Sequence, residues 1–323
     1  MTTLMRTAAS LPRHNVKDSF LKDTTMTAAN LLTPGADREQ IVEGDNPLGL
    51  EGIEFIEYAT AKPQALGQVL ETMGFKPVAR HRSREVLLYR QGGINVIVNA
   101  HVKGSPLSDK PLISAVALRV RDAAAAYRRA LERGAWGVPT HVEVMELNIP
   151  AIHGVGTSRI YFVDRHKQFS IYDVDFTPIP GVDQHPPATA GLHFFGIVQY
   201  IGNDRSDDWT EFYRELLGFQ PLPPEQRFGI LPKGRILRSP CPAESRFYIQ
   251  LIEPEASVLD VEDDEGLHRI GLGSADVLAT VAELSRRGVE FVSSPSVRTS
   301  ERGALSRTWL GCVSFEIVHD VRG

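Results

Sequence analysis

Two helical segments of this chain share one spacing, and this repeat constrains the fold more than any other feature. Each begins with an aspartate, Asp122 or Asp276, and each ends at a glycine, Gly134 or Gly288, after the same number of residues. Aspartate favours a helix start because its carboxylate accepts hydrogen bonds from free backbone N–H groups, and glycine favours a helix end. The repeat predicts that one supersecondary unit is used more than once.

The unit itself can be followed in the first ordered part of the chain. Residues 52–58 alternate apolar and polar side chains as a half-buried strand does. Residues 65–73 keep helical apolar spacing and stop at Gly74. Two apolar strands, 85–89 and 94–98, then follow around a glycine-containing turn. The order predicts a βαβββ unit.

Further strands and helices repeat this order along the rest of the chain. The expected elements are a strand at 114–118, a helix at 122–134, strands at 159–163 and 169–173, a strand at 191–200, a helix at 208–217, strands at 246–251 and 268–273, a helix at 276–287 and a strand at 313–318. We therefore expect an α+β fold of four βαβββ units, paired into two half-barrel domains.

Composition changes set the expected boundaries. Residues 1–44 lack sustained periodicity and predict a flexible tail. A proline-rich connection, residues 178–187, separates the two halves. We expect a metal-free first domain at 45–181 and a metal-binding catalytic domain at 187–323.

Charge and cysteine content exclude several classes of protein. The chain has 323 residues and a net charge of -5, which gives no indication of nucleic-acid binding. It contains no apolar stretch of the roughly 18 residues that a membrane span needs, and no secretion signal. Its cysteines, Cys241 and Cys312, form no CxxC pair, so we expect both to be reduced packing residues. The chain reads as cytoplasmic.

Three ligand-type residues stand on strands of the second half. His193 and His268 lie on the first strands of the third and fourth units, and Glu316 lies on the last strand. Two histidines and one carboxylate form the facial triad that suits non-haem Fe(II), although another divalent metal could bind. Such a triad leaves positions open for a small-molecule substrate and for O₂.

A packing role is the alternative for each of these residues, because a single histidine on a strand is more often packed or exposed than metal-bound. The first half serves as an internal control. Alignment on the helices places Ser114 opposite His268, Tyr172 opposite Glu316 and Glu54 opposite His193. These three residues make no plausible triad, which favours a metal site in the second half only.

Several segments resemble the 4-hydroxyphenylpyruvate dioxygenase family of the vicinal oxygen chelate superfamily. The resemblance is dense over residues 46–181, for example at Asn46-Pro47-Leu48-Gly49-Leu50-Glu51-Gly52 and at Met145-Glu146-Leu147-Asn148-Ile149-Pro150. It is weaker in the second half, at Gly191-Leu192-His193, Glu265-Gly266-Leu267-His268 and Phe315-Glu316-Ile317-Val318. A similar first half also occurs behind a 3-dehydroshikimate dehydratase barrel in some bacteria.

The resemblance implies Fe(II) at His193, His268 and Glu316, and an O₂-dependent reaction that decarboxylates a 2-oxo acid and attacks an aromatic ring. The sequence departs from the family around the substrate. The family usually has glutamine before the second histidine and asparagine before Glu-Pro, where Leu267 and Ile252 stand here. The chain also ends at Gly323, so the family's closing C-terminal helix is expected to be missing. We interpret the chain as a shortened, divergent member with a shifted substrate.

Three functions therefore remain open. The first is an Fe(II) dioxygenase acting on a 2-oxo acid or a related chelating aromatic molecule. The second is a non-oxidative metal-dependent isomerase, dehydratase or ring-cleavage enzyme, and the third is a non-catalytic relative that binds a small molecule. Ser239, Gln250 and Trp309 are candidate substrate contacts. Proteins of this architecture often pair through the metal-free half, so a homo-oligomer is a further expectation.

Overall fold

The structure of the chain is a computed structural model. It describes residues 46–101, 107–139, 147–167, 169–226, 228–229, 234–253, 265–295 and 297–322. The expected tail, residues 1–44, lies outside the described residues. Residues 41–323 group together as one unit.

The first half contains the expected strand–helix–strand order. Its elements are β1 (Leu50–Ala59), α1 (Pro63–Thr72), β2 (Lys76–His81), β3 (Val86–Gln91), β4 (Ile94–Asn99), β5 (Leu112–Val120), α2 (Ala123–Glu132), β6 (Ala151–His153), β7 (Arg159–Val163), α3 (Ile171–Asp175) and β8 (Phe176–Pro178).

The second half repeats the order after a short 3-10 turn at Thr189–Gly191. Its elements are β9 (His193–Tyr200), α4 (Ser206–Leu217), β10 (Gln220–Pro221), β11 (Arg235–Arg238), a 3-10 turn at Ala243–Ser245, β12 (Tyr248–Ile252), β13 (Gly266–Ser274), α5 (Val277–Arg286), β14 (Gly303–Leu305) and β15 (Phe315–His319). The predicted vicinal oxygen chelate fold is confirmed.

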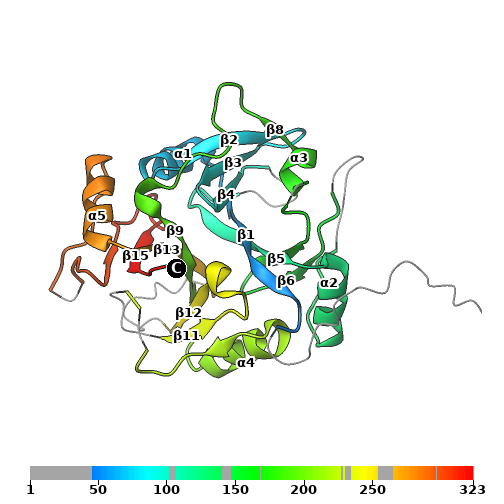
Figure 1. The fold of residues 1–323 in the computed structure, drawn as a ribbon. Helices are drawn as coiled ribbons and strands as arrows, with labels where there is room; N and C mark the ends of the chain where they lie inside the picture. The colour runs from blue at the N-terminus through cyan, green and yellow to red at the C-terminus, as the bar shows by residue number, and fades with distance from the viewer. Residues whose placement is uncertain are drawn as a thin grey trace, which may run out of the picture. The chain divides into compact units, whose positions relative to one another are not determined.

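Strand pairing shows how the units combine. In each unit the first strand runs parallel to the last, as β1 does with β4, β5 with β7, β9 with β12 and β13 with β15. The first strands of neighbouring units pair antiparallel, β1 with β5 and β9 with β13. Leu267 of β13 also pairs with Ile113 of β5, which joins the sheets of the two halves. In Figure 1 these four first strands run through the middle, and α1, α2, α4 and α5 lie outside them.

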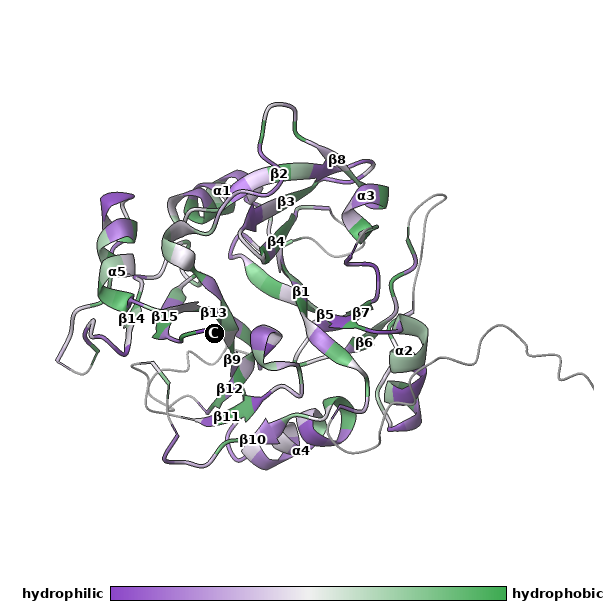
Figure 2. Ribbon diagram, in the orientation of Figure 1, coloured by the Kyte–Doolittle hydropathy of each residue, from purple (hydrophilic) through white to green (hydrophobic). Residues whose placement is uncertain are grey.

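The helix ends follow the local signals in the sequence. The Asp122 side chain accepts a hydrogen bond from the Ala125 backbone N–H, and Asp276 does the same with Ala279, both at 2.9 Å. The helix α4 ends at Gly218, which has φ 75° and so adopts the left-handed conformation that glycine tolerates. Figure 2 shows both apolar and polar residues on α2 and α4, as expected for helices that bury one side.

The predicted strand at 169–173 is wrong, because residues 171–175 form α3. The cause is a capping box. The backbone N–H and the Oγ of Ser170 both donate to Asp173 Oδ2, at 2.7 and 2.9 Å. These bonds satisfy the groups that a helix start leaves open, so the local chain prefers a helical turn to an extended strand. Tyr172 therefore lies on a helix and not opposite Glu316.

Buried side chains form two clusters. The larger one runs through both halves and includes Tyr58, Val116, Phe194 and Ile270. The smaller lies in the first half alone, with Phe55, Ile97 and Phe176 among its members. None of the described helices is long and apolar enough to cross a membrane.

Candidate functional site

Strand β13 carries Arg269, Gly271 and Gly273 on one face, because alternate residues of a strand face the same side. Gly271 pairs with Glu316 of β15, and Gly273 pairs with His193 of β9. Two of the predicted ligands therefore lie on the strands that flank the same stretch of β13.

His193 lies over Gly273. A Cβ atom added to Gly273 would overlap the His193 Nε2 atom, so only glycine leaves room for this ring. The Nε2 atom lies 2.8 Å from Asp320 Oδ2. The hydrogen bond with His193 holds the pKa of Asp320 below its ordinary value, and the nearby Arg322 acts in the same direction. His193 is thus paired with a carboxylate two residues before the end of the described chain.

Glu316 is buried and faces a cation. The Arg269 Nε atom lies 3.6 Å from Glu316 Oε2, and both side chains are only 5% exposed. Among the residues that the structure describes, Arg269 Nε and Nη2 are buried without a hydrogen-bond partner. The arrangement is a buried ion pair with guanidinium N–H groups still unsatisfied.

The His268 side chain makes different contacts from the neighbouring Arg269 side chain. The pairing of β13 with β9 shifts register between Leu267 and Arg269, and His268 is the extra residue at this bulge. Its ring stacks on Tyr200, with centroids 4.2 Å apart and planes at 15°. The residue that reaches Glu316 from β13 is Arg269.

The donor set does not fit the metal that the resemblance implies. Within the described ranges no group of three His, Cys, Asp or Glu side chains is placed to hold a metal ion. The structure therefore does not bring His193, His268 and Glu316 together. A permanently charged guanidinium instead lies against the carboxylate that would bind the metal.

Arg269 was not among the site residues predicted from the sequence. In the sequence, the family's glutamine–histidine pair was expected at Leu267-His268. In the structure, the side chain of β13 that contacts Glu316 is Arg269, one residue after His268. No sequence signal distinguishes these two positions, because the bulge and the register of β13 against β15 are set by tertiary pairing.

The candidate substrate contacts separate into two groups. Gln250 lines a cavity of about 30 Å³ beside Glu316, together with Phe195, Phe228 and Tyr248. Ser239 and Trp309 are not among the described residues that line it. Ser239 accepts a hydrogen bond from the Phe247 backbone N–H at 3.0 Å, and Trp309 packs edge-on against Phe315. These two residues have structural partners.

The cavity beside Glu316 is small because aromatic rings fill it. Phe228 packs against Phe195 and Tyr248, with centroids 5.2 and 4.8 Å apart. Gly229 comes so close that an added Cβ would overlap Glu316 Oε1. The remaining volume is about that of one or two waters.

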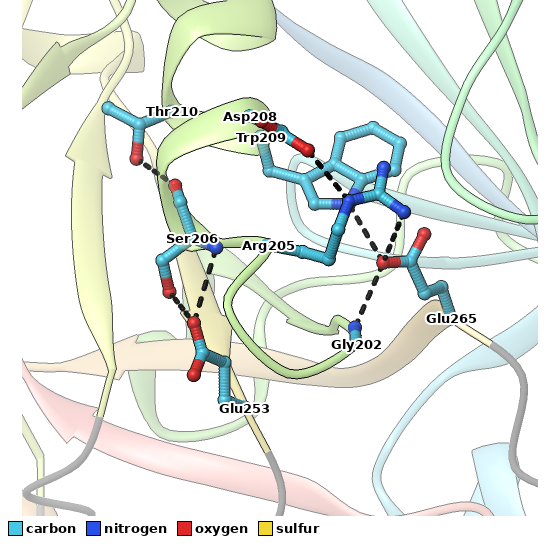
Figure 3. A network of polar contacts seen from close by, with 8 residues as sticks. All are labelled: Gly202, Arg205, Ser206, Asp208, Trp209, Thr210, Glu253 and Glu265. Carbon is cyan, nitrogen blue, oxygen red and sulfur yellow. Dashed lines mark hydrogen bonds and ion pairs between the residues drawn. The ribbon is translucent and has the colours of Figure 1, made fainter.

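A polar network fixes the start of β13 (Figure 3). Glu265, the residue before β13, accepts hydrogen bonds from the Gly202 N–H at 2.9 Å and from Trp209 Nε1 at 3.2 Å. Glu253, the residue after β12, accepts hydrogen bonds from the backbone N–H and the Oγ of Ser206. The bond from Ser206 lowers the pKa of Glu253. Both carboxylates therefore connect strand ends to the segment at the start of α4.

The first half shows what the equivalent positions contain. We matched the two strands by counting residues back from the helix N-caps Asp122 and Asp276. Ala115 is then the counterpart of Arg269, and Ala117 is the counterpart of Gly271. Ala117 pairs with Tyr161 of β7. The residue opposite Glu316 is therefore Tyr161 and not the predicted Tyr172.

Comparisons with known proteins agree with this architecture. The family description "Hydroxyphenylpyruvate dioxygenase, HPPD, N-terminal" matches residues 44–177. The chain is 37% identical to a 4-hydroxyphenylpyruvate dioxygenase of Pseudomonas sp. (strain P.J. 874), over 78% of this chain and 73% of that protein.

Two further relatives carry the same region within longer proteins. A 3-dehydroshikimate dehydratase of Pseudomonas aeruginosa is 30% identical, over 85% of this chain and 45% of that one. A solved xylose isomerase-like TIM barrel/4-hydroxyphenylpyruvate dioxygenase fusion protein has a TM-score of 0.66 and 26% identity, over 86% of this chain and 51% of that one. This chain belongs to the 4-hydroxyphenylpyruvate dioxygenase family.

Proposed function

We propose that this chain is a small-molecule-binding member of the family that works without the dioxygenase metal. The single observation that carries the proposal is the buried contact of Arg269 with Glu316. It corresponds to the third of the functions that the sequence left open.

The physical reason is electrostatic. Arginine stays charged at any pH at which the protein is folded, and it cannot donate a lone pair to a metal. A divalent cation beside Glu316 would compete with the guanidinium for the same carboxylate and would be repelled by it. Binding the metal would therefore require Arg269 to leave a site in which it is only 5% exposed.

The test is to measure metal content and oxygen consumption on the same preparation. The protein is incubated anaerobically with Fe(II), desalted and analysed for iron, and O₂ uptake is then followed with 4-hydroxyphenylpyruvate. The Pseudomonas dioxygenase treated in parallel is the positive control. We expect far less than one iron per chain and no substrate-dependent O₂ uptake. One iron per chain together with O₂ uptake would overturn the proposal.

The iron-dependent dioxygenase remains the second candidate, because two observations favour it. His193 and Glu316 both lie on strands that flank β13. Relatives that are 37% and 33% identical to this chain are 4-hydroxyphenylpyruvate dioxygenases. In that case Arg269 would have to swing away from Glu316, and the iron measurement decides between the two candidates.

A further inference from the structure

The first half contains a cavity of about 370 Å³, whereas the cavity beside Glu316 in the second half measures about 30 Å³. The larger cavity lies inside the curled sheet, between β1, β3 and β4 on one side and β7, α3 and β8 on the other. Its volume is in the range of sites that bind small organic molecules.

The two halves also differ at one pair of equivalent strand positions. Arg269 in the second half contacts Glu316, and its counterpart in the first half is Ala115, which has only a methyl group. Beside Ala115 on β1 lies Glu57, whose counterpart beside Arg269 on β9 is Val198. The first half therefore has a carboxylate on its cavity wall, where the second half has Val198 beside Arg269.

Glu57 is held in a fixed orientation on the cavity wall. Its Oε1 atom accepts hydrogen bonds from Ser114 Oγ at 2.8 Å and from Asn99 Nδ2 at 3.3 Å. Within the described residues no hydrogen bond reaches the other oxygen, Oε2. Burial raises the pKa of Glu57, and these two bonds oppose the rise. One oxygen of a preoriented carboxylate remains able to accept a bond from a ligand.

Positive charge and a phenol lie on the same wall. Arg84 and Arg159 both line the cavity, and each lowers the pKa of Glu57 through its charge. Tyr161 OH lies 3.5 Å from an Arg159 guanidinium nitrogen. Burial raises the pKa of Tyr161, and the charge of Glu57 adds to the rise, so the phenol stays protonated and can donate a hydrogen bond. The two guanidinium groups on this wall can bind a ligand carboxylate through charge-assisted hydrogen bonds, and the second lining carboxylate, Asp175, belongs to α3.

The remaining lining is largely apolar. Phe55, Val86 and Ile97 contribute from the sheet, and Phe176 contributes from β8. Phe176 packs edge-on against the rings of both His81 and Tyr172. These surfaces suit a ring of carbon atoms, because burying apolar area is favourable without requiring further hydrogen bonds.

We propose that this cavity is a binding site for a hydroxylated ring carboxylate, with the ligand's carboxylate at Arg159 and Arg84 and its hydroxyl group donating to Glu57. The apolar ring would lie between Phe55 and Phe176. This inference does not rest on the proposed absence of metal in the second half, because it involves none of the residues around Arg269 and Glu316.

The test uses 4-hydroxybenzoate as the probe, with calorimetric titration of the full chain. Benzoate lacks the hydroxyl group, and 4-hydroxybenzyl alcohol lacks the carboxylate. We expect saturable binding of 4-hydroxybenzoate to one site and binding weaker by on the order of tenfold for each of the other two compounds.

Single substitutions test which side chain binds the hydroxyl group and which binds the carboxylate of the ligand. Glu57→Gln keeps the shape and can still accept from Ser114, so it should fold normally but no longer prefer 4-hydroxybenzoate over benzoate. Arg159→Met should lose the preference for 4-hydroxybenzoate over 4-hydroxybenzyl alcohol. Arg128→Met, on the exposed side of α2, is the matched control and should bind as the wild type does.

Two results would overturn the inference. One is the lack of saturable binding of 4-hydroxybenzoate at millimolar concentration. The other is binding that survives Glu57→Gln and Arg159→Met but is lost when Arg269→Met is combined with Glu316→Gln, which would place the ligand in the second half. Neither result depends on iron content, so a failure here is distinct from a failure of the proposed function.

Discussion

Arg269 Nε lies 3.6 Å from Glu316 Oε2, and both side chains are buried in the second half. Taking two charges out of water is costly, and their attraction offsets the cost only when both partners are present. Removing either Arg269 or Glu316 would therefore leave the other charge buried without a partner of opposite sign, which destabilises the fold. The pair also engages Glu316, one of the three residues predicted from the sequence to bind a metal.

The first prediction is that Arg269→His creates a metal site. Histidine at this position would remove the permanent charge and add a ligand on the face that carries Glu316, with His193 on the neighbouring strand. We expect the variant to bind about one Co(II) or Fe(II) per chain, as measured by titration and metal analysis.

His268→Gln is the matched control for this prediction. Because the His268 ring stacks on Tyr200, its replacement should change the metal content of neither the wild type nor Arg269→His. Loss of metal from Arg269→His on adding His268→Gln would show that His268, and not residue 269, supplies the ligand.

The second prediction concerns Gly273. Gly273→Ala would place a methyl group where the His193 ring lies, so the ring must move and its bond to Asp320 must lengthen or break. We expect a loss of about 1–3 kcal/mol in the free energy of unfolding, measured by urea denaturation. Gly93→Ala is the control, since nothing lies within 4 Å of a Cβ at Gly93. Equal stability of the two variants would contradict the position assigned to His193.

The third prediction is a pH dependence carried by Glu57. Burial is the largest influence on its pKa and raises it above the ordinary value of 4.5. A carboxyl with a raised folded-state pKa contributes stability that is fully present below the unfolded pKa and is lost as pH rises through the folded pKa.

Glu57→Gln should therefore be more stable than the wild type at pH 8, and the difference should vanish near pH 4. Each unit of pKa difference corresponds to about 1.4 kcal/mol in the free energy of unfolding. The measurement is urea denaturation of both proteins across this range. A difference that does not change with pH would rule out the raised pKa.

The fourth prediction compares the two cysteines. Burial raises the pKa of Cys241 to about 11, and its side chain is 3% exposed. Burial also raises the pKa of Cys312, but this residue is only partly buried, and the charge of Lys110 opposes the rise. Because the thiolate is the reactive form, iodoacetamide at pH 8 should modify Cys312 well before Cys241. Peptide mass spectrometry of briefly treated native protein measures the order, and faster labelling of Cys241 would contradict it.

Much of the fold could be predicted because its signals are local. The caps Asp122 and Asp276 accept bonds from residues three positions later, so their role depends only on neighbours in the chain. The end of α4 at Gly218, which adopts the left-handed backbone conformation, also depends only on neighbouring residues. The strand predicted at 169–173 failed for the same kind of reason, since Ser170 and Asp173 form a capping box that its alternating pattern concealed.

The candidate site was less predictable because it depends on contacts between distant strands. His193 and Glu316 were placed on the correct strands, but the choice between His268 and Arg269 depends on one bulge in the pairing of β13 with β9. A shift of one residue reverses which side chains face the cleft. Composition and periodicity do not contain that information.

The sequence by itself determined the repeated unit, the helix ends and the family, because each depends on residues close together in the chain or on similarity along it. Only the tertiary structure decided that Arg269 faces Glu316, that Tyr161 is the counterpart of Glu316, and that the larger cavity lies in the first half. The physical reason is that strand register and cavity volume result from packing between segments that are far apart in sequence.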